Sequence, residues 1–322
     1  MKKIAILDDY LHLALQSADW SVLDGRCQLD VIDRKLQVPD EAAEVLAPYH
    51  VLCHLRERMP MPRTLIERLP NLEFMTVTGK AHRTLDLAAA AEHGIAISHT
   101  SAGNIGSNAT PELAWGLILA SVRHIAYEDR KMREGGWQNT IGTLLDGKTL
   151  GLLGLGRIGQ RMARIGQAFG MNVIAWSRNL TQEAAAEVGV TRVDKDTLFR
   201  ESDVLSIHVV LSELSRHLVG RRELALMKRS AVLVNTARGP IVDEAALIDA
   251  LAAGSLAGAG LDVFEQEPLP EQHRLRQMEN VVLTPHLGYA TRETFSGFYQ
   301  ATVTAVQAYL DGKPTNLLGS LI

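Results

Sequence analysis

Arg238, Glu267 and His286 each stand just beyond an apolar run of β-strand type in the second half of this sequence. An arginine can hold a carboxylate through two hydrogen bonds and polarise a neighbouring carbonyl. A histidine is the usual general acid–base near neutral pH, and a carboxylate bonded to it orients the ring and stabilises its protonated form. These three groups suit hydride transfer between a nicotinamide and a 2-oxo or 2-hydroxy acid, in which His286 handles the hydroxyl proton.

Each of these residues has a plainer interpretation when it is taken alone. Arg238 suits an exposed surface position, the acids around Glu267 suit a solvated loop, and a single histidine such as His286 is more often structural. Position favours the chemical interpretation, because ligands of open α/β sheets bind beyond the carboxyl ends of the strands.

A glycine motif offers a place for the cofactor that such chemistry needs. Gly154, Gly156 and Gly159 form the pattern G-x-G-x-x-G between the apolar run 149–153 and a helical stretch over Arg157–Phe169. In a dinucleotide-binding turn the first glycine makes the tight turn, the second lets the backbone approach a pyrophosphate, and the third lets helix and strand pack closely. The helix N-terminus then attracts the phosphates. The motif predicts a bound nicotinamide or flavin nucleotide rather than a purely structural turn.

The identity of the nicotinamide depends on the end of the next strand. NAD-selective domains place an acidic residue about 20 positions beyond the glycines to hold the ribose hydroxyls. Here Ser177 occupies that position and Arg178 follows it. A serine and an arginine can bind a 2′-phosphate, which tilts the prediction toward NADP(H). An exposed Arg178 in an NAD-binding protein is the alternative.

The elements that must position these residues alternate along the chain, which indicates α/β architecture with parallel sheets. The first half contains strand-type runs at Ile4–Leu7, Leu29–Ile32, Val51–Leu55, Phe74–Val77 and Ile95–Ile97. The second half contains such runs at Leu150–Leu153, Val173–Trp176, Val204–Val209, Ala231–Val234, Ala259–Val263 and Val281–Thr284. We expect two doubly wound, Rossmann-like domains.

Two helical segments suggest how these domains connect. Pro111–Ile125, with Pro111 in its first turn, would join them, and Thr291–Leu310 is left over once the second sheet is complete. We therefore expect residues 1–100 and 291–322 to form a split substrate domain, into which a nucleotide-binding domain of residues 101–290 is inserted.

The chain resembles the D-isomer-specific 2-hydroxyacid dehydrogenase family over essentially its whole length. The shared motifs are G-L-G-R-I-G at 154–159, N-T-A-R-G at 235–239, L-D-V-F-x-x-E-P at 261–268 and T-P-H-L-G at 284–288. The resemblance implies a flavodoxin-like substrate domain, an inserted NAD(P)-binding Rossmann domain, an active-site cleft between them, and usually a homodimer through the nucleotide domain. Reduction or oxidation of an acid of the glyoxylate, hydroxypyruvate or 3-phosphoglycerate type is the implied activity.

The resemblance also assigns roles to individual residues. Arg238 would bind the substrate, Glu267 would partner the histidine, and His286 would be the acid–base catalyst. The implied cofactor contacts, besides Gly154, Gly156, Gly159, Ser177 and Arg178, are Arg157, Ile158, Thr236, Ala237, Asp262 and Gly288.

The first half departs from the family pattern at its small glycine-rich loop, whose backbone N–H groups usually meet the substrate carboxylate. This chain has Gly79 there, followed by the cation Lys80, which hints at a larger or more anionic substrate. Arg56 matches a position where some phosphoglycerate dehydrogenases hold an arginine near the substrate phosphate; a strand-end arginine paired with an acid is the alternative. His82 is interpreted as an ordinary loop residue.

Composition narrows the class of protein. The 322 residues carry 33 basic and 37 acidic side chains, a formal net charge of −4, without a basic stripe for nucleic acid or a polybasic cluster for anionic lipid. Cys27 and Cys53 are expected to be buried thiols in a reducing compartment, and no metal site is expected. We predict a cytoplasmic enzyme. A nucleotide-sensing, corepressor-like binding protein of the same fold is the rival hypothesis.

Overall fold

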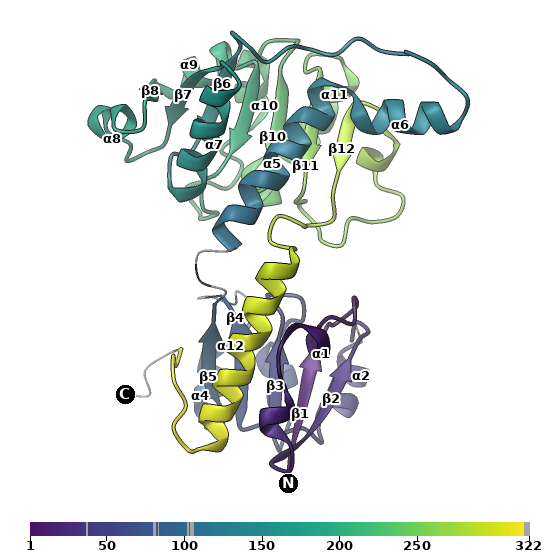
Figure 1. Ribbon diagram of the computed structural model, residues 1–322, viewed down its shortest axis with the longest axis vertical. Helices are drawn as coiled ribbons and strands as arrows, with labels where there is room; N and C mark the ends of the chain where they lie inside the picture. Colours follow the sequence, from purple (N-terminus) through teal and green to yellow (C-terminus); the bar gives the residue numbers. More distant parts are fainter. Residues whose placement is uncertain (37, 80–81, 83, 102, 104–105, 319–322) are drawn as a thin grey trace. The chain divides into compact units, whose positions relative to one another are not determined.

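The computed structural model describes residues 1–36, 38–79, 82, 84–101, 103 and 106–318. The chain divides into two compact units, each an α/β structure built on its own sheet (Figure 1). Unit 1 is formed by Met1–Ile105 together with Thr291–Ile322, and unit 2 by Gly106–Ala290. Unit 1 is thus discontinuous in sequence.

The sheet of unit 1 is parallel, and among the described residues it has five strands in the order β2-β1-β3-β4-β5. The strands are β1 (Lys2–Leu7), β2 (Cys27–Ile32), β3 (Val51–His54), β4 (Phe74–Thr78) and β5 (Ala96–Thr100). This is the flavodoxin-like strand order. The five strands lie where they were predicted, and most of their ends agree to within two residues.

Helices cover both faces of this sheet. The elements are α1 (Ala14–Ser17), the 3₁₀ turn η1 (Ser21–Leu23), α2 (Pro39–Leu46), α3 (Arg63–Ile66), α4 (Leu87–Glu92) and α12 (Arg292–Leu310). Side chains of α2, α3 and α4 pack on one face in a continuous apolar core. The long helix α12 covers the other face, where Tyr309 stacks on Phe74 of β4 with ring centroids 4.4 Å apart. The leftover C-terminal helix therefore completes unit 1.

The sheet of unit 2 is also parallel, with seven strands among the described residues in the order β12-β11-β10-β9-β6-β7-β8. The strands are β6 (Thr149–Leu153), β7 (Asn172–Trp176), β8 (Thr191–Arg192), β9 (Val204–Ile207), β10 (Val232–Asn235), β11 (Gly258–Leu261) and β12 (Val281–Leu283). The order reverses at β6, which is the topological switch point where doubly wound sheets bind ligands. The predicted fold class is confirmed.

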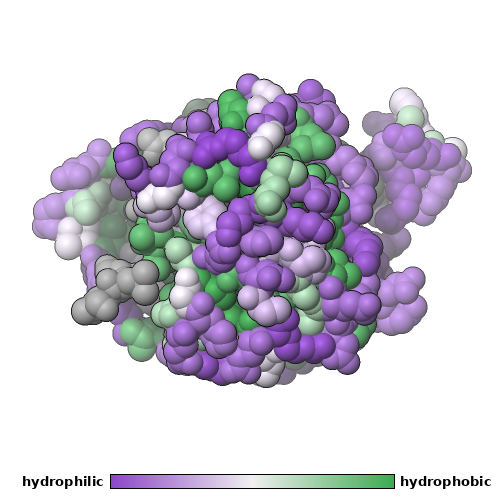
Figure 2. Space-filling model, turned by 90° about the horizontal axis from the view of Figure 1, so that it is seen from below, coloured by the Kyte–Doolittle hydropathy of each residue, from purple (hydrophilic) through white to green (hydrophobic). Residues whose placement is uncertain are grey.

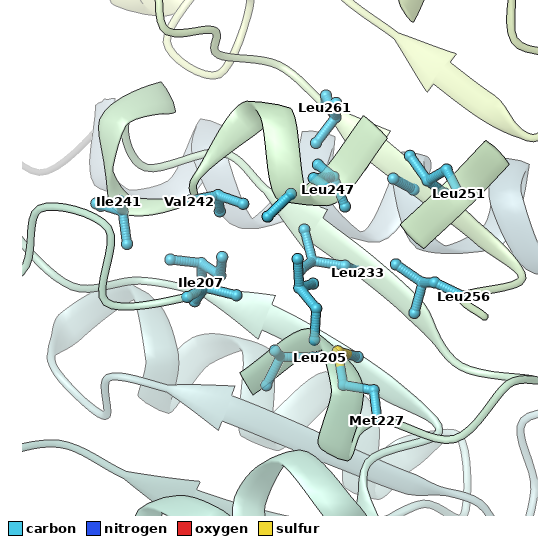
Figure 3. Packing of buried hydrophobic residues seen from close by; sticks show 14 of the residues in the cluster. Leu205, Ile207, Met227, Leu233, Ile241, Val242, Leu247, Leu251, Leu256 and Leu261 are labelled. Carbon is cyan, nitrogen blue, oxygen red and sulfur yellow. The ribbon is translucent and has the colours of Figure 1, made fainter. Parts of the chain in front are cut away.

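Two apolar cores hold the helices of unit 2 against its sheet. The elements are α5 (Gly106–Val122), α6 (Ile125–Arg133), α7 (Arg157–Ala168), α8 (Gln182–Ala186), α9 (Lys195–Glu201), α10 (Arg221–Leu226), α11 (Glu244–Ala252) and the 3₁₀ turns η2 (Gly239–Ile241) and η3 (Arg274–Gln277). Helices α5, α7 and α8 contribute to one core, and α9, α10 and α11 to the other. In the second core Leu205, Leu233 and Leu247 point toward one another (Figure 3).

Three expectations differ from the structure. Pro111 lies inside α5, which already begins at Gly106 and ends at Val122, so the proline is not in the first turn. The short strand β8 was not predicted, because two exposed residues give no apolar run. Cys53 is buried, and burial raises the pKa of its thiol to about 12, but Cys27 is only half-buried because β2 is an edge strand.

The surface is mixed in character. The face in Figure 2 shows hydrophilic residues interspersed with small apolar patches, as is common on globular domains. Among the described residues, the helices are all too short or too polar to cross a membrane.

Candidate active site

The glycine turn between β6 and α7 has the geometry that its sequence predicts. Gly154 has a φ of 107°, and a Cβ there would lie 2.8 Å from the carbonyl carbon and oxygen of His208. A Cβ on Gly159 would lie 2.1 Å from the carbonyl oxygen of Gly154. Because both contacts are with backbone atoms that cannot move aside, only glycine fits at these two positions.

Gly156 differs from its two neighbours, because a Cβ there would meet nothing within 4 Å. It is the N-cap of α7, and no side chain caps the helix at this end. Helix geometry leaves the first N–H groups, including those of Arg157 and Ile158, without partners inside the helix. Open space beside uncapped amides at a positive helix end fits a pyrophosphate, so the turn suits a dinucleotide.

Ser177 and Arg178 directly follow β7, the strand beside β6. Ser177 is half-buried and its carbonyl accepts a hydrogen bond from Leu180 N, whereas Arg178 is exposed. The preference for NAD or NADP that these two residues would set remains a prediction. The structure places the cation Arg178 just after β7, next to the strand β6 that leads into the glycine turn.

The sheet order explains how three distant motifs come together. Strands β10, β11 and β12 are neighbours, and their carboxyl ends lie on one edge of the sheet. Arg238 comes three residues after β10, Asp262 directly after β11, and His286 three residues after β12. The loop after β11 continues to Glu267.

Glu267 and His286 form a close pair, with 2.6 Å between Glu267 Oε2 and His286 Nδ1. The other carboxylate oxygen, Oε1, accepts a hydrogen bond of 3.0 Å from Phe264 N. Burial raises the pKa of Glu267, but the hydrogen bond from His286 and the charges of His286 and Arg238 outweigh it, so the pKa lies below its ordinary value. A carboxylate only accepts, so Nδ1 carries the proton and Nε2 is left to exchange one with a substrate.

The turn that carries His286 is held by Asp262, which is fully buried. Its carboxylate accepts hydrogen bonds from Thr284 Oγ1 at 2.6 Å, Leu287 N at 2.7 Å and Gly288 N at 2.8 Å. Burial raises the pKa of Asp262, and these donors work against that rise. His286 itself has a φ of 56°, a strained conformation for a non-glycine residue, which Asp262 helps to maintain.

Arg238 lies in a turn that is held by the side chain of Asn235, a residue to which the sequence analysis gave no role. Asn235 Nδ2 donates to the carbonyl of Arg238 at 2.9 Å, and Asn235 Oδ1 accepts from Ala237 N at 3.0 Å. The half-buried Arg238 donates from Nη1 to the carbonyl of Ala237 at 2.7 Å.

Thr236 is buried, and no described residue bonds its hydroxyl. The predicted contacts of Thr236, Ala237, Asp262 and Gly288 with a cofactor remain predictions.

Gly239 brings the Arg238 turn against the loop that carries Glu267. A Cβ at Gly239 would lie 1.9 Å from the carbonyl carbon and oxygen of Phe264 and 2.5 Å from Glu265 N. The two loops therefore nest backbone to backbone, which is possible only with glycine. This contact couples the placement of Arg238 to that of Glu267.

In unit 1, Arg56 and Gly79 lie together at the carboxyl ends of β3 and β4. Gly79 has a φ of 99°, and a Cβ there would lie 2.8 Å from Arg56 Nη1. Arg56 has a φ of 60°, and its backbone N–H donates to the hydroxyl of Thr78. Lys80, the third predicted substrate contact of this unit, lies outside the described residues.

Two buried histidines, His54 and His82, lie ring to ring in unit 1, and their contact was not predicted from the sequence. The ring of His82 is buried and stands edge-on to that of His54, with centroids 5.5 Å apart and planes at 86°. Burial lowers the pKa of His54 to about 3, so its ring is neutral near pH 7. His82 was interpreted as an ordinary loop residue because one histidine among polar neighbours gives no sign of burial.

Comparison with known proteins shows that this chain is similar to a family of dehydrogenases and reductases. Residues 115–288 match the family model described as the D-isomer specific 2-hydroxyacid dehydrogenase, NAD binding domain. The chain is 42% identical over 264 residues to a glyoxylate reductase from Aeropyrum pernix, covering 79% of this chain and 78% of that protein. It is 40% identical over 276 residues to a hydroxypyruvate reductase from Thermotoga maritima, covering 84% and 88%.

A solved structure shares the fold of the whole chain. The phosphoglycerate oxidoreductase from Vibrio cholerae o395 superimposes with a TM-score of 0.89 at 33% sequence identity, over 97% of this chain and 100% of that one.

Proposed function

We propose that this chain, which belongs to the D-isomer specific 2-hydroxyacid dehydrogenase family, reduces a small 2-oxo acid of the glyoxylate or hydroxypyruvate type. The chain is an oxidoreductase that acts on CH–OH donors with a nicotinamide cofactor. The names of two relatives, a glyoxylate reductase and a hydroxypyruvate reductase, support the choice of acid. A 3-phosphoglycerate-type substrate is the second candidate, favoured by the likeness to a phosphoglycerate oxidoreductase.

The observation that carries this proposal is the 2.6 Å contact between His286 Nδ1 and Glu267 Oε2. When bound, the nicotinamide supplies the hydride that reduces the substrate carbonyl. His286 gives the proton that converts the carbonyl oxygen to a hydroxyl, and Glu267 stabilises the protonated ring beforehand. Arg238 holds the substrate carboxylate and polarises the neighbouring carbonyl.

We assign the substrate domain to unit 1 and the cofactor domain to unit 2. The open cradle at Gly156 and the uncapped start of α7 support the second assignment. Arg56, Gly79 and Lys80 are the proposed substrate contacts of unit 1. The close approach of the Arg56 guanidinium to Gly79 supports a shared role for that pair in binding an anion.

The assay that tests the function follows nicotinamide absorbance with NADH and with NADPH against glyoxylate, hydroxypyruvate, pyruvate, 2-oxoglutarate and phosphohydroxypyruvate. We expect turnover to be fastest with glyoxylate or hydroxypyruvate. Tight cofactor binding without turnover of any acid would instead favour the nucleotide-sensing, corepressor-like hypothesis.

We propose NADP(H) as the preferred cofactor, because Arg178 can pair with a 2′-phosphate that an acidic residue would repel. Arg178→Ala should raise the dissociation constant of NADPH by about tenfold or more, the value of one charge-assisted hydrogen bond, and leave that of NADH within about twofold. Isothermal titration with both cofactors measures this. Arg164→Ala is the matched control, since Arg164 is also exposed but lies on α7 away from the end of β7. Equal losses for the two cofactors would refute the 2′-phosphate contact.

We also propose a homodimer formed through unit 2. Trp137, Ile141 and Leu144 follow α6 and leave 74%, 95% and 73% of their surfaces exposed, which is unusual for large apolar side chains. Sedimentation equilibrium would show whether the protein is a dimer at micromolar concentration. The cytoplasmic location expected from the cysteine usage stays a prediction.

A further inference from the structure

We propose that Glu244 is a positioning residue, which holds the loop that carries Glu267 and so sets the geometry of the Glu267–His286 pair. Glu244 is the first residue of α11 and comes five residues after Gly239 in the sequence. The inference rests on the proposed function, because that function gives the Glu267–His286 pair its part in proton transfer.

Both oxygens of the Glu244 carboxylate are used by the loop. Oε2 accepts a hydrogen bond of 3.2 Å from Glu265 N, and Oε1 lies 3.1 Å from His273 Nε2. About four fifths of the Glu244 and His273 side chains is buried, with 20% and 21% exposed. The contact with His273 is partly buried, and hydrogen bonds to a charged acceptor are stronger than those between neutral groups, so both contacts contribute to order in the loop.

The protonation of His273 follows from its second contact. Its Nδ1 accepts a hydrogen bond of 3.3 Å from Leu275 N at the start of η3. A ring nitrogen that accepts carries no hydrogen, so the neutral ring bears its proton on Nε2 and donates it to Glu244. The neutral tautomer of His273 can therefore make both contacts at once.

The two residues that Glu244 contacts flank Glu267 in the chain. Glu267 lies between Glu265 and His273 in the chain, and its Oε1 accepts from Phe264 N, next to the peptide that Glu244 holds. Gly239 packs on that same peptide. Release of Glu244 would free the Phe264–Glu265 peptide and change the direction of Glu267 toward His286.

The charges around Glu244 are compatible with this arrangement. The side chain of Glu265 is directed to Arg216, 3.5 Å away, and to His217, 3.9 Å away, so its own carboxylate does not confront that of Glu244. Asp243, the N-cap of α11, accepts a hydrogen bond from Ala246 N. The start of α11 also favours the negative charge of Glu244.

The test compares Glu244→Ala and Glu244→Gln with Glu267→Gln in the full-length enzyme, through kcat, KM and the pH profile of oxoacid reduction. In Glu267→Gln the ring of His286 loses its anionic partner, 2.6 Å away, so the profile should move to lower pH. Glu244→Ala should lower kcat by about tenfold and move the profile in the same direction by a smaller amount, with the affinity for NADPH unchanged. In Glu244→Gln the amide oxygen can still accept from Glu265 N, but the amide N–H would face the N–H of His273 Nε2. The effect of this variant should therefore lie between those of the wild type and Glu244→Ala.

Asp249→Asn is the matched control, because Asp249 is also a carboxylate on α11 but pairs with the exposed Arg221. It should leave all three readouts unchanged. If Glu244→Ala folds and keeps the wild-type pH profile while Glu267→Gln shifts it, the positioning role of Glu244 is wrong and the proposed function stands. If Glu267→Gln leaves the profile in place, the role of the pair in proton transfer fails, and the role of Glu244 fails with it.

Discussion

Replacement of His286 by asparagine should lower kcat for oxoacid reduction at least about a hundredfold, the usual contribution of a general acid–base catalyst. An amide cannot deliver a proton to the developing alkoxide, whereas the imidazole paired with Glu267 at 2.6 Å can. Asparagine is preferable to alanine here, because His286 has a φ of 56° and asparagine tolerates that left-handed conformation. Steady-state turnover of glyoxylate or hydroxypyruvate measures the effect.

His124→Asn is a suitable control for this experiment. His124 has a φ of 53° and lies between α5 and α6, so the same change is made on the same kind of backbone away from the pair. In His286→Asn we expect the loss of kcat to exceed any loss of cofactor affinity, because the proposed pyrophosphate site at the glycine turn after β6 is separated from the His286 turn by three intervening strands. A His286→Asn enzyme with wild-type kcat would remove this histidine from the reaction.

Gly239→Ala should have the second large effect, on both activity and stability. The new Cβ would lie 1.9 Å from the carbonyl carbon and oxygen of Phe264, so one of the two backbones must move. Overpacking of this kind costs about 1–3 kcal/mol of stability. Because the Phe264–Glu265 peptide leads to Glu267, a displacement of about 1 Å should also reduce kcat/KM by about a hundredfold. Thermal unfolding and steady-state kinetics measure the two effects.

Gly116→Ala separates this effect from a general intolerance of alanine. Gly116 lies within α5, and a Cβ there meets nothing within 4 Å. Its replacement should leave activity unchanged and stabilise the helix by up to about 1 kcal/mol. Wild-type kinetics in a folded Gly239→Ala enzyme would show that the two loops are not coupled through this contact.

Much of this fold follows from periodicity in the sequence. The runs that became β6, β7, β9, β10, β11 and β12 are mostly apolar, as is typical of parallel strands covered on both faces. Once these strands are recognised, the rule that ligands bind beyond their carboxyl ends selects Arg238, Glu267 and His286. The short contact between Glu267 and His286 confirms that two of them meet.

The contacts between loops were not predictable in the same way. Glu244 acts on segments distant in sequence, because it accepts a hydrogen bond from Glu265 N and pairs with the side chain of His273, and no local pattern of residues marks such partners. Asn235 bonds the backbone of its own turn, but its sequence does not show that this turn holds Arg238. Gly239 was recognised as part of the motif N-T-A-R-G. The need for glycine there comes from the close approach of the Phe264–Glu265 peptide, which is visible only in the folded chain. The start of α5 was also misjudged, because its first residues carry no apolar stripe.

The discontinuity of unit 1 has a consequence for the order in which the protein is completed during synthesis. The strands of unit 1 emerge first, but the face that Phe74 presents stays uncovered until Tyr309 of α12 has been made. Unit 2 is continuous from Gly106 to Ala290 and has all its strands before then. We therefore expect unit 2 to have its whole sheet available before unit 1 can be completed, because the apolar face around Phe74 is covered only once α12 has been synthesised.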